Sequence, residues 1–277
     1  MDFTIEETCH NIELYKEQVY KSRRDRDSNK IVENYLQKLT NIKARHRIIL
    51  VAWLFDVNNT FKEDDKVNID LFFLCVRLID TCLSNSEHVD LSQLQLLGVV
   101  CYSIAQKLEA IYPYAIEKLL YICDTASYTK SIFINTERLV LQALDYDCWI
   151  PTVKHFVDYY MTDHKEIKQK HQVVACYIAC LTTLSYSLQT QYTQRDIAAA
   201  CIFVVEILFK LNKIVTDTHN GCNIAVINHI KHSKFQSELN NEFIKTFVGP
   251  GIRVYILEII RLIKSFSRFT SFCINNV

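Results

Sequence analysis

The spacing of apolar residues is the feature that most constrains this chain. Asn68 precedes an apolar series whose members fall three or four positions apart: Ile69, Phe72, Phe73, Val76, Ile79 and Leu83. That spacing places them on one face of an α-helix, which Asn68 can cap. The 277 residues include only four Gly and three Pro, too few for the frequent hairpin turns of an all-β fold. We therefore predict an all-α protein.

Other segments of the first half show the same pattern. Asp90 and Gln93 have the form of a capping box, and the residues from 94 to 108 that follow them form an apolar helical face. The nearly continuous apolar run from 48 to 57 could be a buried strand or a buried helix by periodicity alone. Its helical neighbours favour a helix.

Two more segments complete the first half. Pro113 can begin a helix that continues through Tyr121, and Thr129 can cap one that ends near Leu144. These patterns together predict five helices between about residues 44 and 145.

The second half repeats this organisation. Pro151 opens a fresh apolar run, which places a boundary near residue 150. Thr193 and Asp196 form a capping pair before a helix that looks like a second copy of the Asp90 helix. Residues 252–263 supply a last helix. The expected divisions are an N-terminal helical extension, a first helical fold and a second one, at residues 1–29, 30–150 and 151–277.

Charge and hydropathy exclude several classes of protein. Lys plus Arg and Asp plus Glu both number 31, so no net field draws the chain to nucleic acid or anionic lipid. The longest apolar run, Ile48 to Phe55, is far shorter than the roughly 20 residues that span a bilayer. The acidic N-terminus is unlike a secretory signal. We expect an intracellular protein of the nucleus and/or cytoplasm, with no nucleic-acid or membrane partner.

No pattern of catalytic or metal-binding residues stands out. The eleven cysteines include no CxxC pair, and Cys176 with Cys180 is only a helical spacing. His229 and His232 lie three apart in a polar segment and are read as solvated. There is no Gly-rich phosphate loop, HExxH or nucleophile motif. We expect reduced thiols, no metal, no cofactor and no catalytic residue.

The segment Arg47-Ile-Ile-Leu-Val-Ala-Trp-Leu-Phe-Asp-Val57 resembles the first helix of a cyclin box, with Arg, an apolar run, Trp and an acid in that order. The resemblance covers about residues 40 to 160 and is closest to cell-cycle cyclins of the A, B and E kinds. It implies tandem cyclin folds, two five-helix bundles, which agrees with the helix count above. Further matching segments are Leu78 to Leu83, Leu94 to Gly98, Ala105 to Pro113, Glu137 to Leu141, Ala143 to Asp147 and Ile197 to Ala200.

The resemblance implies a non-catalytic subunit that binds and activates a cyclin-dependent serine/threonine protein kinase and promotes cell-cycle progression. In cyclins, a lysine and a glutamate hold the main chain around a mobile helix of the kinase, and here these are Lys107 and Glu137. An ammonium donates to carbonyls and a carboxylate accepts from N–H groups, so both types suit this role. Without the resemblance, both would be read as solvated surface charges. The family pattern adds Leu108, Leu141, Tyr146 and Cys148 as anchors.

The resemblance also implies a docking patch for Arg-x-Leu peptides of substrates or inhibitors. Trp53 and leucines would hold the peptide leucine, and Asp56 would face its arginine. The alternative is that the apolar members belong to the core. The expected docking residues are Ile49, Leu50, Trp53, Asp56, Leu94 and Gln95.

Departures from the family pattern indicate a divergent cyclin, for which a viral or parasite origin is one hypothesis. Arg47 and Asp80 are expected to be structural, but Ala52 stands where the family usually has Asp, which removes the usual partner of Arg47. His46 replaces an apolar residue at the edge of the docking patch. The alternative function is a cyclin-fold adaptor that binds a non-kinase protein such as a transcription factor.

Overall fold

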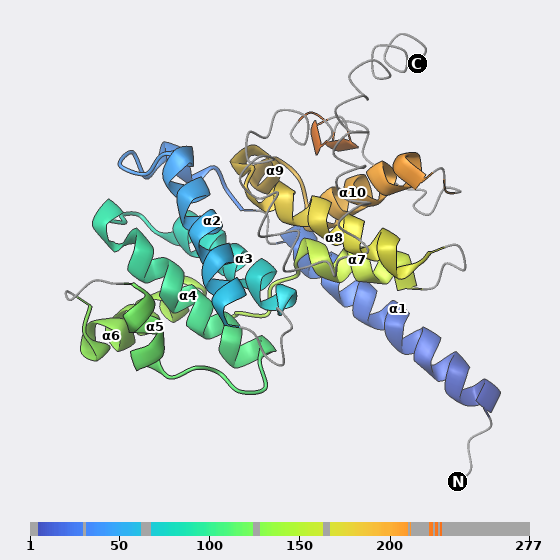
Figure 1. Cartoon of the computed structure of the whole chain (residues 1–277), viewed down its shortest axis with the longest axis horizontal. Coiled ribbons are helices and arrows are strands. Elements are labelled where there is room, and N and C mark those ends of the chain that lie inside the picture. Colours follow the sequence, from blue (N-terminus) through green and yellow to red (C-terminus); the bar gives the residue numbers. More distant parts are fainter. Residues whose placement is uncertain are drawn as a thin grey trace.

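A computed structural model describes residues 5–29, 32–61, 68–123, 128–162, 167–209 and 211, with a few positions between 222 and 228. Helices form all the regular structure within residues 5–209 of that description. The long helix α1 (Ile5–Asn29) projects from the body of the molecule, as Figure 1 shows. The first bundle contains α2 (Ala44–Thr60), α3 (Ile69–Asn85), α4 (Leu94–Glu109), α5 (Ile116–Ile122) and α6 (Lys130–Ala143).

Four helices of a second bundle follow. They are α7 (Val153–Thr162), α8 (Gln169–Thr183), α9 (Tyr186–Gln191) and α10 (Gln194–Phe209). The predicted helix at 252–263 lies outside the described residues. The all-α class, the two tandem helical folds and the N-terminal helical extension are confirmed. The limits at 1–29, 30–150 and 151–277 stay a prediction. None of the described helices is both long enough and apolar enough to cross a membrane.

Three predicted helix starts are confirmed by their capping hydrogen bonds. Asn68 Oδ1 accepts from the Leu71 backbone N–H at 3.2 Å. Thr129 Oγ1 accepts from the Ile132 N–H at 3.3 Å, and Thr193 Oγ1 accepts from that of Asp196 at 3.1 Å. Local chemistry therefore determined where these helices begin, because the cap satisfies an N–H group that the helix leaves without a partner.

Two predicted starts are displaced. Asp90 caps a single 3₁₀ turn, η2 (Leu91–Gln93), through the Ser92 N–H, and α4 begins only at Leu94. The expectation that Pro113 begins the next helix is wrong, since α5 starts at Ile116. The ring of Tyr114 packs against Phe61 with centroids 4.3 Å apart, and this contact lies where the helix was expected to begin.

Helix α3 lies between two hydrophobic cores. Its residues Leu74 and Leu78 pack into the first core, whereas Phe72 and Val76 pack into the second. This explains why α3 is apolar around most of its circumference. The first core also includes Leu54, Val100, Tyr102, Phe133 and Val140, and the second includes Phe156, Ile178, Ala199, Cys201 and Val205.

A buried ion pair links these layers. Arg47 of α2 has its guanidinium bonded to both carboxylate oxygens of Asp80 on α3. The third donor, Nη1, reaches the Thr183 carbonyl of α8 at 2.6 Å, and the Tyr35 hydroxyl donates to Asp80 at 2.9 Å. Burial alone would lower the pKa of Arg47, but Asp80 more than offsets this and raises it. Ala52 removes the partner that Arg47 usually has in the family, but the buried pairing is kept, because Asp80 takes that role.

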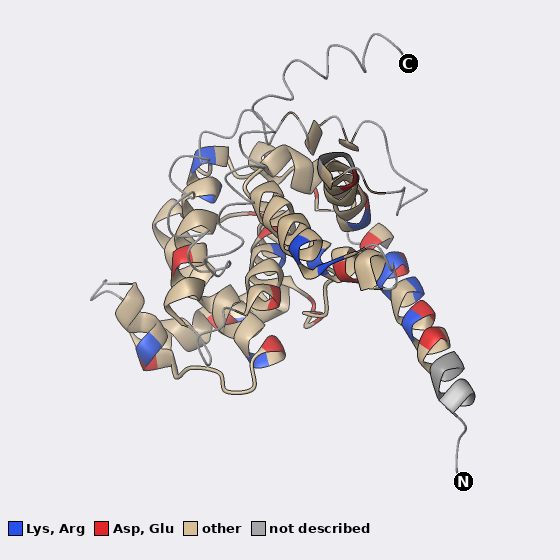
Figure 2. Cartoon of the chain, turned by 45° about the vertical axis from the view of Figure 1, so that its right-hand side comes forward, with Lys and Arg blue, Asp and Glu red and all other residues tan. Residues whose placement is uncertain are grey.

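The end of α1 makes hydrogen bonds to the first turn of α10 and to the segment that follows α6. Asp27 accepts hydrogen bonds from the backbone N–H groups of Gln194 at 3.1 Å and Arg195 at 2.9 Å, in the first turn of α10. Arg26 donates to the Trp149 carbonyl at 2.9 Å and pairs with Asp147. Figure 2 shows that Lys and Arg positions alternate with Asp and Glu positions along the ribbon of α1.

Candidate functional site

Lys107 and Glu137 meet at the surface of the first bundle. Lys107 lies in the last turn of α4 and Glu137 near the middle of α6, thirty residues further along the chain. Packing of α4 against α6 brings the Lys107 ammonium into direct contact with the Glu137 carboxylate. The Lys107 side chain is 50% exposed and that of Glu137 is 15% exposed. A partner can therefore reach the ammonium.

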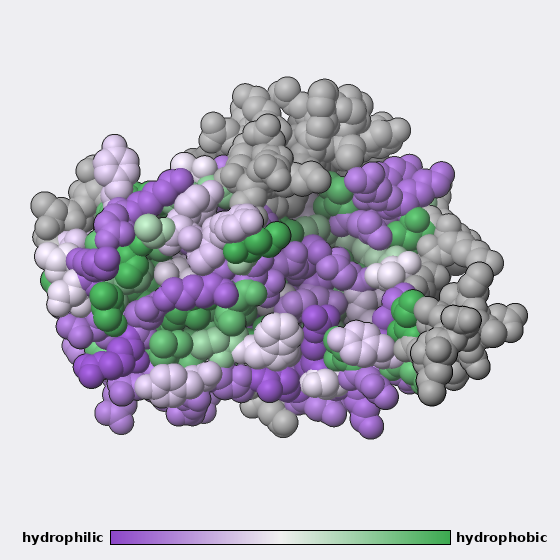
Figure 3. Space-filling view, turned by 90° about the horizontal axis from the view of Figure 1, so that it is seen from below, coloured by the Kyte–Doolittle hydropathy of each residue, from purple (hydrophilic) through white to green (hydrophobic). Residues whose placement is uncertain are grey.

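The predicted anchors differ in their exposure to solvent. Leu108 and Tyr146 are exposed, whereas Leu141 and Cys148 are partly buried against the first core. Additional exposed apolar residues follow α4, namely Ile111 and Tyr112, each 79% exposed, and the sequence reading missed both. The sequence did contain a signal for these two exposed residues, because they are large apolar residues directly after the polar end of a helix. Figure 3 shows hydrophobic side chains over the first bundle on one face.

The chain after α6 holds Tyr146 in an unusual conformation. Asp145 and Tyr146 have φ angles of 51° and 57°, in the left-handed region that non-glycine residues rarely adopt. The Tyr146 N–H donates to the Leu141 carbonyl at 2.8 Å, which closes this helix end. Tyr146 is 65% exposed, so its strained backbone presents an aromatic ring to solvent.

A groove of about 360 Å³ lies between α2 and the start of α4. Five of the six predicted docking residues line it, but Asp56 does not. Leu50 and Leu94 are buried core residues that form its floor, whereas Ile49 is 64% exposed. The docking role of these residues stays a prediction. The lining residues are His46, Ile49, Leu50, Trp53, Leu91, Leu94 and Gln95.

Leu91 and His46 lie at the edge of the groove. The sequence reading missed Leu91, an exposed apolar residue in η2. His46 accepts a hydrogen bond from the Lys43 N–H through Nδ1 at 3.2 Å, which holds its ring at the start of α2.

Cysteines and histidines form no metal centre in the described part of the chain. No group of three or more His, Cys, Asp or Glu side chains there could hold an ion. Burial raises the pKa of Cys82 to about 11, which keeps that thiol protonated at neutral pH. His229 and His232 lie outside the described residues.

Comparisons with known proteins agree with this architecture. The family described as "Cyclin, N-terminal domain" matches residues 18–149. The G2/mitotic-specific cyclin-A of Hydra viridissima is 31% identical over 196 residues, covering 69% of this chain and 45% of the relative. Cyclin-A1-4 of Oryza sativa subsp. japonica is 34% identical over 202 residues, covering 72% and 54%. The chain thus spans about half the length of these relatives.

A solved structure shows the same fold. The viral cyclin from herpesvirus saimiri superimposes with a TM-score of 0.58 at 16% sequence identity, over 89% of this chain and 95% of the viral one. At that identity the likeness concerns the fold alone. The sequence matches to the cyclin N-terminal domain and to the cyclin-A relatives show that the chain belongs to the cyclin family.

Proposed function

We propose that this chain is a regulatory subunit that binds a cyclin-dependent serine/threonine protein kinase, activates it and promotes cell-cycle progression in the nucleus and/or cytoplasm. The observation that carries this proposal is the surface ion pair of Lys107 and Glu137 beside exposed apolar side chains. Exposed apolar residues around a polar pair are typical of protein interfaces.

The geometry suggests how the pair would act. In the free chain the two charges form an ion pair with each other. This pair adds little to the free energy of folding, because the ammonium is half exposed to solvent. On binding, the Lys107 ammonium would donate to main-chain carbonyls of the kinase, and the Glu137 carboxylate would accept from its N–H groups. Leu108, Leu141, Tyr146 and Cys148 would supply the apolar contacts.

Activation would follow from differential binding. A kinase samples active and inactive positions of its mobile helix, and a partner that binds the active position more tightly shifts the population toward it. The active position completes the Lys–Glu ion pair and the metal site of the kinase. The chain itself would contribute no catalytic group.

The test is a pull-down from cell lysate followed by a phosphorylation assay on the bound material. Wild type is compared with Lys107→Ala/Glu137→Ala. The matched control is Glu117→Ala/Lys130→Ala, which removes another Lys–Glu pair of the same bundle, 2.7 Å apart and exposed on both sides. We expect kinase activity with wild type and the control, and a loss of about tenfold or more with the first variant.

Two other results would change the proposal. If the chain binds a kinase that shows no activity, its function would be to sequester the kinase and not to activate it. If no kinase is bound from cells that express several kinases, the alternative function would be favoured, in which the chain is a cyclin-fold adaptor for a non-kinase protein.

We also propose that Arg-x-Leu peptides of substrates or inhibitors dock in the groove between α2 and α4. Its apolar floor and the exposed Ile49 suit a leucine side chain. Asp56 is exposed on α2, one turn beyond Trp53, where it could meet the peptide arginine.

A labelled Arg-x-Leu peptide tests this groove by fluorescence polarisation. We expect Trp53→Ala to weaken binding about tenfold or more. Trp149→Ala is the matched control, because Trp149 is exposed and does not line the groove. Equal binding of an Ala-x-Ala peptide would refute the assignment.

A further inference from the structure

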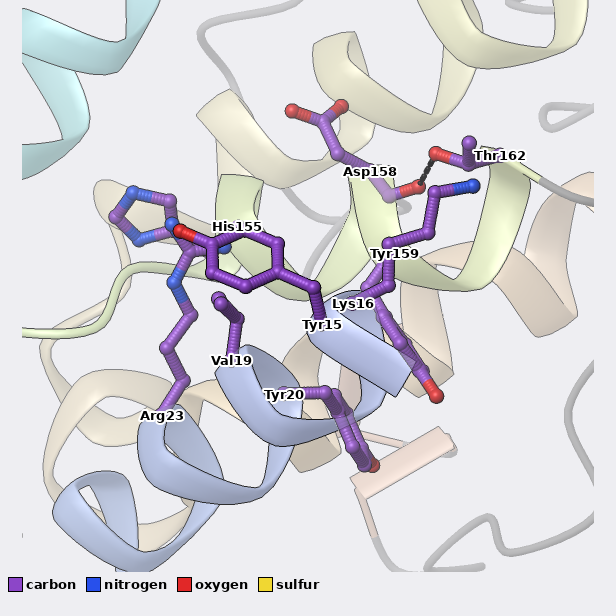
Figure 4. A pocket seen from close by; sticks show the side chains of 9 residues that line it. All are labelled: Tyr15, Lys16, Val19, Tyr20, Arg23, His155, Asp158, Tyr159 and Thr162. Atoms are coloured by element: carbon purple, nitrogen blue, oxygen red, sulfur yellow. Dashed lines mark hydrogen bonds between the residues drawn. The ribbon is translucent and has the colours of Figure 1, made fainter. Parts of the chain in front are cut away.

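A second pocket lies between α1 and α7, apart from the surfaces discussed above. It has a volume of about 200 Å³, and Figure 4 shows the side chains that converge on it from the two helices. Its lining residues are Tyr15, Lys16, Val19, Tyr20 and Arg23 of α1 with His155, Asp158, Tyr159 and Thr162 of α7. None of them belongs to the proposed kinase face or to the docking groove.

One end of the pocket is cationic. The Arg23 guanidinium has no hydrogen bond or ion pair with any residue that the structure describes, although it is partly buried. Burial lowers the pKa of Arg23, and the more distant carboxylates of Asp158, Glu109 and Asp70 oppose that effect. Arginine carries five N–H donors in a planar fork that matches the oxygens of a phosphate. This end of the pocket therefore offers unfilled donors to an anion.

His155 adds a neutral donor beside Arg23. Its Nδ1 accepts from the Thr152 backbone N–H at 3.1 Å, so the neutral ring carries its proton on Nε2. Burial, with a contribution from Arg23, lowers the pKa of His155 to about 4, which keeps the ring neutral at pH 7. Figure 4 shows the Arg23 side chain extending toward the His155 ring. The two side chains therefore lie near each other at this end of the pocket.

The remaining walls are aromatic and apolar. Tyr20 and Tyr159 stack with ring centroids 3.9 Å apart, and the hydroxyl of Tyr20 bonds that of Tyr160 at 3.0 Å. Tyr15 and Val19 lie on the α1 side in Figure 4. Such walls favour a flat ring over a short polar side chain, because aromatic pairs gain both contact area and favourable geometry.

Asp158 is the acidic residue that lines the pocket, and its negative charge acts on Arg23. In Figure 4 the Asp158 carboxylate points away from the pocket. It is also paired with the Lys154 ammonium, which lies 3.8 Å from Asp70 as well. The Lys16 ammonium lies toward Thr162, at the far end from Arg23.

We propose that this pocket binds a phosphotyrosine side chain of a protein partner, with the phosphate on Arg23 and His155 and the ring against the wall that the stacked Tyr20 and Tyr159 form. Phosphate adds up to two negative charges and three acceptor oxygens, which match the donors at that end. The aromatic stem matches the apolar walls, whereas a phosphoserine would leave them empty.

The experiment titrates the full chain with N-acetyl-O-phosphotyrosine amide and follows the ¹H–¹³C NMR signals of its histidines. N-acetyl-tyrosine amide, N-acetyl-O-phosphoserine amide and inorganic phosphate are the comparison ligands. We expect phosphotyrosine to bind about tenfold more tightly than each of them. Arg23→Gln should weaken its binding about tenfold, because the bidentate charge-assisted contact is lost.

Arg24→Gln is the matched control, since Arg24 is the next residue on α1, does not line the pocket and contacts Asp25 at 3.5 Å. Arg23→Lys keeps the positive charge but loses the planar fork of donors, so this variant should bind phosphotyrosine with intermediate affinity. Its circular dichroism spectrum should match that of wild type, which shows that the variant is folded. Equal affinity for inorganic phosphate and phosphotyrosine would overturn the proposal, as would unchanged binding in Arg23→Gln or no binding at about 10 mM ligand. None of these readouts involves a kinase.

Discussion

Arg47 and Asp80 form a two-pronged ion pair in the interior of this cyclin. The Arg47 Nε lies 2.7 Å from Asp80 Oδ1, and its Nη2 lies 2.6 Å from Oδ2. The two side chains are 0% and 1% exposed. Because Arg47 also donates to the Thr183 carbonyl of α8, the pair joins the first bundle to the second.

Removing one partner of this pair should destabilise the chain strongly. Asp80→Ala leaves a buried guanidinium without its counterion, and we expect a loss of about 3 to 5 kcal/mol in the free energy of unfolding. Urea denaturation followed by circular dichroism measures it. The double variant Arg47→Met/Asp80→Leu should lose much less, since it leaves no uncompensated charge. A similar loss in both proteins would contradict this account.

Asp27 should make stability depend on pH. Burial raises its pKa above the ordinary value of 3.8, and the N–H groups of Arg195 and Gln194 only partly oppose this. The native state then binds the proton more tightly than the unfolded state. The stability of wild type relative to Asp27→Ala should therefore be greatest below pH 3.8 and fall as pH rises through the native pKa. Urea denaturation of both proteins at a series of pH values measures this slope. A stability difference between wild type and Asp27→Ala that rises with pH would refute the prediction.

His155 should produce the opposite slope as pH falls from 6.5 to about 4. Its pKa is lowered from 6.5 to about 4 by burial, so between these values the unfolded state binds a proton that the native state does not. Wild type should lose about 1 to 3 kcal/mol relative to His155→Gln as pH falls through this window. The pKa itself can be read from the histidine ¹H NMR signal, and a value near 6.5 would exclude the effect.

Gly98 links the interior of the first bundle to the docking groove. A Cβ atom at Gly98 would lie 2.8 Å from Leu50 Cδ1, and Leu50 forms part of the groove floor. In Gly98→Ala, the better helix propensity, worth about 1 kcal/mol, should offset the cost of moving the flexible end of Leu50. We expect stability within about 1 kcal/mol of wild type but weaker binding of the Arg-x-Leu peptide. Thermal unfolding and fluorescence polarisation measure the two effects, and unchanged binding would contradict the link.

Lys107 should matter for binding and little for folding. Its ion pair with Glu137 is half exposed on the lysine side, so Lys107→Ala should change the free energy of unfolding by less than about 1 kcal/mol. The same substitution should weaken kinase binding, measured by pull-down. A stability loss as large as that of Asp80→Ala would instead make Lys107 a structural residue.

Local sequence patterns predicted most helices and several of their first residues. Asn68, Thr129 and Thr193 cap the helices that they were expected to cap, because capping needs only one side chain and the next turn of backbone. Pro113 failed as a helix start, since α5 begins three residues later. Propensity is a weak guide where long-range packing, such as that of Tyr114 on Phe61, also acts.

The candidate sites were predicted only in part. The resemblance supplied Lys107, Glu137 and the docking residues, and the structure shows the first two in contact and five of the docking residues around one groove. Leu91 at the groove edge and Arg23, which has no hydrogen bond or ion pair among the described residues, were not foreseen. Both depend on which helices become neighbours, which spacing along one segment does not contain.

The sequence by itself determined the all-helical class, the faces of the helices and the order of the cyclin segments, because periodicity and capping act within a few residues. Only the tertiary structure decided the partners across the chain. Arg47 found Asp80 rather than an acid at position 52, and Asp27 reached the start of α10. A buried charge takes whichever counterion or N–H group the packed helices bring within about 3 Å, and that distance exists only after folding.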